Sequence, residues 1–145
     1  MAFMAKKYSE LKACACAVLR QSSRLITQYY EDAYRVHHIT SAQFNIMSVL
    51  ANTGSITVSQ LAETLLQDRT GLTRNLKIMN NNGWVSIQQG DDRRVKNVEL
   101  TNQGFEKLDL VIPLWREVQR KVSEEVLNLD QLQQDRAKLR KLTQT

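Results

Sequence analysis

The 145-residue sequence predicts a single, mainly helical domain that carries a small β element of two or three strands. Three observations lead to this fold class. Apolar residues recur at helical spacing through most of the chain, capping residues stand at several helix starts, and alternation replaces the helical period after residue 84. A chain of this length buries a core without metals or disulfides, so one domain is expected.

A long, uninterrupted amphipathic helix is expected from Ser9 to Val36. Apolar or small residues follow the three-and-four spacing of one helix face. Such a stripe is more often part of the chain's own core than a contact between subunits. Its members are Leu11, Ala15, Val18, Ser22, Leu25, Tyr29 and Ala33.

Three shorter helices follow, and each has a recognisable start. Thr40 with Gln43, and Thr57 with Gln60, form capping boxes in which side chains satisfy free backbone N–H groups. Asp68 is a good N-cap for the third helix. The first of the three ends at NTG, and the third ends at NNNG, which is typical of a helix C-terminus.

The segments WVSIQ and VKNVEL change from helical to alternating periodicity. Val85 and Ile87 share one face of the first segment, and Val98 and Leu100 share one face of the second. We therefore expect a β-hairpin with QGDDRR as its loop.

Two helices are expected after the hairpin. Thr101 caps the first, and Pro113 either kinks it or separates two helices. The tail from Asp130 predicts a last helix with a thin apolar stripe. The apolar positions are Phe105, Leu108, Ile112, Trp115, Val118, Val122 and Val126 in the first helix and Leu132, Leu139 and Leu142 in the last.

The net charge of +5 is concentrated in the middle of the chain. Between Asp68 and Val98, six cations stand against three aspartates, so three of the five net charges lie there. This segment is the candidate contact surface for a polyanion, and the alternative is a cationic surface that serves solubility.

Composition excludes several classes of protein. No apolar run approaches the roughly 20 residues of a membrane helix, and no export signal is recognisable at the N-terminus, so we expect a cytoplasmic protein without membrane contact. Cys14 and Cys16 do not form a disulfide framework. The sequence contains no carboxylate pair, nucleophile motif, glycine-rich phosphate loop or metal-ligand cluster, so we expect no enzyme, metal or cofactor.

The order of elements is that of a winged helix-turn-helix. In that arrangement the second helix of the pair lies in the DNA major groove and the hairpin forms the wing. Leu72, Leu76 and Met79 should hold the second helix to the domain, while polar residues point outward. Gly71 costs about 1 kcal/mol of helix stability relative to Ala, and close approach of its backbone to DNA would explain it. The candidate DNA contacts of this helix are Arg69, Thr70, Gly71, Thr73, Arg74, Asn75 and Lys77.

The wing supplies the other candidate DNA contacts. A hairpin loop with Arg93 and Arg94 can place a guanidinium in a narrow minor groove, where the negative potential is enhanced. Asp92 can orient Arg94 through a bidentate pair. The alternative is an ordinary surface ion pair of about 0 to 1 kcal/mol.

The segment from Thr40 to Gly104, with DRTGLTRNL, DDRR and LTNQG in this order, resembles the MarR family of bacterial transcriptional regulators. The resemblance implies a homodimer on a palindromic site, with residues 1–38 and 102–145 as dimerisation helices and 39–101 as the DNA-binding lobe. It also makes Arg94 the wing arginine and Asp92 its partner.

The resemblance implies two modes of release from DNA. One is a small aromatic ligand in a cleft near Tyr34, His37 and His38. The other is oxidation, because CACAVLRQSSRLITQYY is similar to the first helix of the organic-hydroperoxide-sensing branch, where Cys16 would be the sensor and Tyr30 its hydrogen-bond partner. Ser41 departs from that branch, which has a second tyrosine there, and Cys14 is additional.

Geometry and burial favour a structural reading of the two cysteines. Residues two apart on a helix face opposite directions, so Cys14 and Cys16 make a poor disulfide or metal clip. Free cysteines are often buried, so we expect one thiol to pack in the core.

The rival to DNA binding is a helical protein-protein interaction module, in which the hairpin arginines would have no role.

Overall fold

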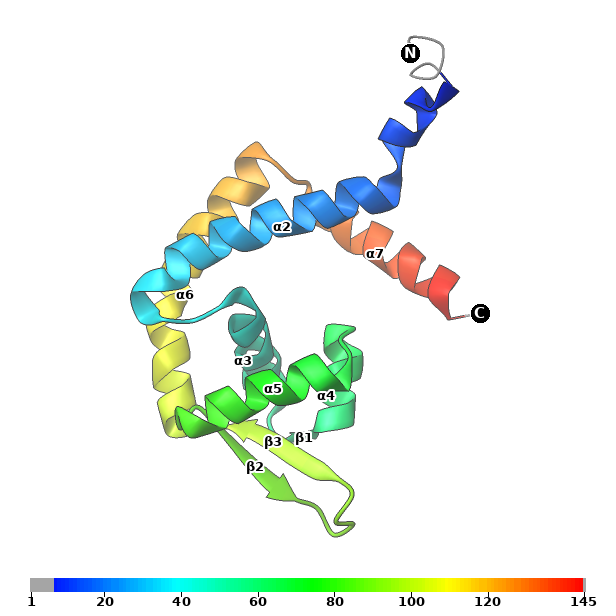
Figure 1. The fold of residues 1–145 in the computed structure, drawn as a ribbon. Coiled ribbons are helices and arrows are strands. Elements are labelled where there is room, and N and C mark those ends of the chain that lie inside the picture. Colours follow the sequence, from blue (N-terminus) through cyan, green and yellow to red (C-terminus); the bar gives the residue numbers. More distant parts are fainter. Residues whose placement is uncertain (1–6, 145) are drawn as a thin grey trace.

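The structure is a computed structural model that describes residues 7–144. Figure 1 shows α2 and α7 above a lobe of shorter helices and strands, with α6 running from the base of that lobe up to α2. The helices are η1 (Ser9–Ala13), α2 (Ala15–Tyr34), η2 (Arg35–His37), α3 (Ser41–Thr53), α4 (Val58–Leu65), α5 (Arg69–Asn81), α6 (Asn102–Glu125) and α7 (Leu129–Thr143), and the strands are β1 (Ile56–Thr57), β2 (Val85–Gln89) and β3 (Lys96–Leu100).

Both predicted capping boxes are present. The Gln43 backbone N–H donates to Thr40 Oγ1 at 3.2 Å, and the Thr40 N–H donates to Gln43 Oε1 at 3.0 Å. Thr57 and Gln60 repeat the arrangement at 3.1 and 3.0 Å. These boxes set the starts of α3 and α4 at the predicted residues.

The sheet has three antiparallel strands in the order β1-β3-β2. Val85 pairs with Leu100, and Ile87 pairs with Val98, so the four predicted apolar residues share one face. That face points into the core, where Val85, Val98 and Leu100 are buried. The two-residue strand β1 adds the third strand, which the sequence had left open.

The hydrophobic core joins the lobe to the C-terminal end of α2 and the N-terminal half of α6. This core contains Leu50 of α3, Leu61 of α4 and Leu76 of α5, together with Leu108 and Val111 of α6. Gly104 lies where α6 meets the hairpin, and a Cβ there would be 2.1 Å from the Trp84 carbonyl oxygen. The base of the wing is therefore packed directly against the start of α6.

The long helices differ from the sequence expectation in several places. Most of the predicted apolar stripe of the first helix, including Val18 and Leu25, is exposed, so the expectation that it packs in the chain's own core is wrong. The first helix is interrupted at Cys14, whose extended backbone separates η1 from α2. Phe105 and Val126 are exposed because they face away from the chain's own core. The helix containing Pro113 is continuous, and it bends along its length (Figure 1), so the alternative of two separate helices is wrong. Within residues 7–144, no helix is both long and apolar enough to cross a membrane.

Tyr34 carries a buried hydroxyl that finds no hydrogen-bond partner among the described residues. Its ring packs 5.0 Å from the ring of Phe44, between centroids, and burial raises the pKa of Tyr34. An unsatisfied buried polar group costs about 1 to 3 kcal/mol, so Tyr34→Phe should raise the free energy of unfolding by up to that amount. Urea denaturation measures it, and a loss of stability would show that the hydroxyl is satisfied.

The same substitution should change the pH dependence of stability. Below about pH 10 the Tyr34 hydroxyl is protonated in both the folded and the unfolded state. Above pH 10 the unfolded tyrosine ionises while burial keeps the folded one protonated, so the free energy of unfolding falls as pH rises toward the raised folded pKa. Wild type should therefore lose more stability than Tyr34→Phe above pH 10. Equal losses would contradict the burial of this hydroxyl.

Candidate nucleic-acid interface

Helix α5 begins at a cap that fixes the orientation of its first turn. Asp68 has extended backbone geometry, and its Oδ2 accepts a hydrogen bond from the Gly71 N–H at 3.1 Å. A Cβ on Gly71 would lie 3.3 Å from the Gln67 side-chain nitrogen, so no rigid group of the described chain requires glycine there. The absence of a side chain leaves this turn open to an outside partner.

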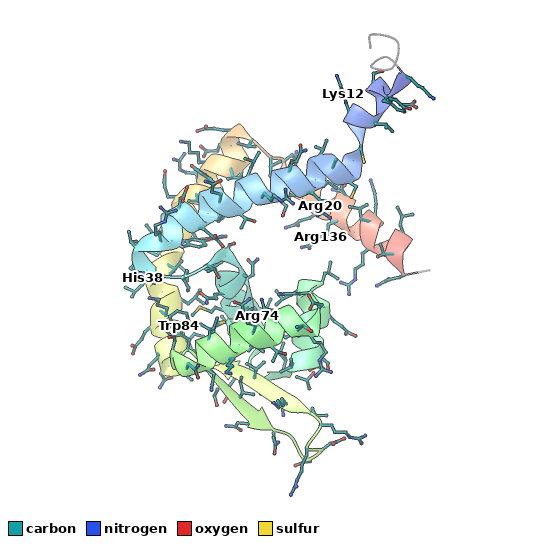
Figure 2. The ribbon with its side chains drawn as sticks, viewed as in Figure 1. Lys12, Arg20, His38, Arg74, Trp84 and Arg136 are labelled. Atoms are coloured by element: carbon teal, nitrogen blue, oxygen red, sulfur yellow. The ribbon has the colours of Figure 1, made fainter. Side chains whose placement is uncertain are left out.

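The two faces of α5 divide as the sequence predicts. Leu72, Leu76 and Met79 are buried in the core and hold the helix to the lobe. On the other face the polar side chains reach solvent, and Figure 2 shows Arg74 on this helix. Gly71 and Asn75 are half-buried, so they contribute less surface than expected. The exposed members are Arg69, Thr70, Thr73, Arg74 and Lys77.

The wing projects from the lobe as the β2-β3 hairpin (Figure 1). The predicted pair at its tip is formed, because Arg94 Nε donates to Asp92 Oδ1 and Nη2 donates to Oδ2, both at 3.3 Å. The Arg94 backbone N–H also donates to Oδ1 at 3.0 Å, and this bond, followed by the guanidinium bonds, lowers the pKa of Asp92. The Arg94 side chain remains 91% exposed, so it is oriented and still free for a partner. Arg93 is exposed beside it.

Two side-chain contacts lie at the base of the wing, beside the backbone hydrogen bond that the Thr101 N–H donates to the Trp84 carbonyl at 3.1 Å. The Thr101 hydroxyl donates to the Gly83 carbonyl, just after the end of α5. Lys107 lies 5.2 Å from the centre of the Trp84 ring. Neither side-chain contact is signalled by periodicity or by local spacing, so the sequence does not predict them.

Comparisons with known proteins agree with this geometry. The MarR family model matches residues 37–94. The structure of M. tuberculosis transcriptional regulator MosR in complex with DNA is similar at a TM-score of 0.81 and 36% identity, over 90% of this chain and 96% of that chain. The chain belongs to the MarR family.

Two curated relatives of this MarR-family chain are also regulators. An uncharacterized HTH-type transcriptional regulator of Bacillus subtilis, YwoH, is 30% identical over 91 residues, which are 63% of this chain and 66% of the relative. The HTH-type transcriptional regulator PecS of Dickeya dadantii is 26% identical over 98 residues, 65% of this chain and 59% of the relative. Both relatives are named as transcriptional regulators, in agreement with the prediction of a regulator.

The predicted effector residues of the MarR-family chain lie apart from one another. Cys14 and Cys16 are both exposed, so the expectation that one thiol packs in the core is wrong. The start of α2 extends beyond the lobe (Figure 1), and the described residues leave both thiols uncovered. Within one chain Tyr30 lies about 21 Å along α2 from Cys16, at 1.5 Å per residue, and its hydroxyl donates to Gln119 instead.

The predicted ligand residues differ in exposure. Tyr34 is fully buried and cannot line an open cleft, which corrects that expectation. His37 is half-buried, whereas His38 is exposed in a left-handed turn after η2. Figure 2 shows His38 and Lys12 at opposite ends of the N-terminal helical segment. An apolar groove of about 660 Å³ lies elsewhere, between α2, the end of α6 and the start of α7, with Ile26 and Val122 among its lining residues.

Proposed function

We propose that this chain binds double-stranded DNA in a sequence-specific manner, with α5 in the major groove and the wing in the minor groove. The observation that carries the proposal is the division of α5 into a buried apolar face and an exposed face of Arg69, Thr70, Thr73, Arg74 and Lys77. Support comes from MosR, whose fold is similar over 96% of its length and whose structure contains DNA.

We propose further that the binding form is a homodimer on a palindromic operator. Leu19, Leu25 and Tyr29 of α2 are exposed, as are Val126 and Leu132 near the start of α7. These five side chains line the 660 Å³ apolar groove. Within one chain the long helices leave them exposed. A second copy would cover this surface and would place two α5 helices on half-sites about 34 Å apart.

DNase I footprinting on the DNA upstream of the protein's own gene tests both statements. Protection should cover two half-sites separated by one helical turn, and sedimentation should give two chains per bound duplex. Protection of one half-site by a single chain would contradict the dimer. Protection that follows no sequence would contradict specific recognition.

We propose that the regulator acts as a repressor that is released by oxidation. Both thiols near the start of α2 are exposed, whereas Tyr34, which was expected to line the ligand cleft, is buried. A thiolate of Cys14 or Cys16 would attack an organic hydroperoxide, break its O–O bond, and form a sulfenic acid with release of the alcohol. Fluorescence anisotropy should show loss of operator binding after hydroperoxide and recovery with dithiothreitol.

The control for oxidation is the double variant with Cys14→Ser and Cys16→Ser. It should bind the operator as wild type does and should keep this binding after hydroperoxide. If wild type is equally indifferent, the cysteines are not sensors and a small aromatic ligand becomes the effector to seek.

The wing arginine should contribute most to A·T-rich flanks. Arg94→Ala removes the guanidinium that the narrow minor groove attracts, so affinity should fall more for an operator with A·T-rich flanks than for one with G·C-rich flanks. Anisotropy on the two duplexes measures the difference. Asp92→Asn, which keeps the cation and weakens its orientation, should give a smaller loss. If Arg94→Ala leaves the function of the protein in the cell unchanged, the protein-protein interaction module is favoured over DNA binding.

A further inference from the structure

A second cationic site lies where the end of α7 approaches α4 and the start of α5. A hollow of about 700 Å³ is formed there by residues from these three helices and from the α4-α5 turn. Figure 1 shows the C-terminal end of α7 on the side of the lobe that carries α4. The polar lining includes Ser59, Glu63, Gln67, Arg69, Arg140 and Thr143.

The two arginines give this hollow its character. Arg69 is the first residue of α5 and Arg140 lies in the last turn of α7, so the two side chains reach the hollow from different helices. Within the described residues neither is in an ion pair, although Glu63 lines the same hollow. Two arginines against one acid leave a net positive charge, and the hydroxyl and amide groups nearby add neutral donors.

Such a donor set fits an oxyanion with more than one negative charge. Guanidinium groups bind carboxylate and phosphate oxygens through charge-assisted, often bidentate hydrogen bonds. An anion in the hollow finds guanidinium donors from both α5 and α7 in its lining. The volume of the hollow lies in the range of small-molecule sites.

The position of α7 gives such binding a consequence. Among its described residues α7 buries none, and Leu139 is 49% exposed, so the chain's own packing does little to fix this helix. A ligand that bridges Arg140 and Arg69 would tie α7 to the helix-turn-helix.

We propose that this hollow binds a multivalent oxyanion of the phosphate or tricarboxylate class between Arg69 and Arg140. The anion links the C-terminal helix to the start of α5. Because Arg69 is also a DNA contact in the proposed function, a bound anion competes with a DNA phosphate for it. That last consequence rests on the proposed function, whereas the anion site itself does not.

Isothermal titration of the full chain with inorganic phosphate and with citrate, without DNA, tests the site. Chloride keeps the ionic strength constant, so that general screening is the same throughout. We expect saturable binding of one of these anions per chain and a rise of the melting temperature with its concentration. Arg69→Gln and Arg140→Gln should each weaken binding at least tenfold. Both side chains are exposed, so circular dichroism should show folded variants.

Arg136→Gln is the matched control, because it removes the same charge from α7 (Figure 2) at a residue outside the hollow. It should bind the anion as wild type does. Absence of saturable binding of both anions, or an equal loss in all three variants, would overturn the proposal. If Arg140→Gln weakens DNA binding while neither anion binds wild type, the hollow extends the DNA surface and the small-anion site is wrong.

Discussion

Arg74→Ala should weaken operator binding by about 1 to 3 kcal/mol, which corresponds to roughly a 5- to 150-fold rise in Kd. Arg74 is exposed in the middle of α5, where a guanidinium can pair in a bidentate manner with a guanine edge. Anisotropy on the footprinted operator measures the loss. The expected loss is specific to sequence, so binding to a shuffled duplex should change much less.

Arg116→Ala is the control for this variant. Arg116 is an exposed arginine of α6, outside the helix pair and the wing. Its removal should leave the preference for the operator unchanged. Equal, small losses for Arg74→Ala on every duplex would reduce Arg74 to a phosphate contact.

Leu72→Ala should lower the free energy of unfolding by about 2 to 5 kcal/mol, since the substitution leaves a cavity in a packed core. Leu72 is fully buried and attaches α5 to the lobe. Chemical denaturation measures the loss. DNA binding should fail at temperatures where wild type still binds, because the buried face of α5 holds the exposed, DNA-contacting face in position.

The matched variant on the same helix is Ile78→Ala. Ile78 is 45% exposed, so its truncation removes fewer core contacts and should cost far less than that of Leu72. Similar losses in the two variants would contradict the assignment of faces on α5.

Local signals were sufficient to predict most elements of the lobe. The capping boxes depend on residues three apart, and the strands depend on alternation over five residues, so both can be read without the rest of the fold. The Asp92–Arg94 pair is equally local. Pairing of β1 with β3 and the placement of Lys107 over Trp84 join distant segments, and no short pattern signals them.

The outer helices were harder to predict because their surroundings are not set by neighbouring residues. Apolar spacing predicted α2, but it did not reveal the break at Cys14 or the exposure of both thiols. The burial of Tyr34 against Phe44 depends on how α2 lies on α3. The hollow with Arg69 and Arg140 likewise exists only because α7 returns toward the lobe.

Sequence-specific DNA binding through α5 and the wing is the main function proposed for this chain. The most direct test is fluorescence anisotropy of the reduced protein on DNA from upstream of its own gene and on a shuffled duplex, at several salt concentrations. We predict affinity for the upstream DNA at least about a thousandfold higher, with binding to both duplexes falling steeply as salt rises. Equal affinity for the two duplexes, or no binding to either, would contradict the claim.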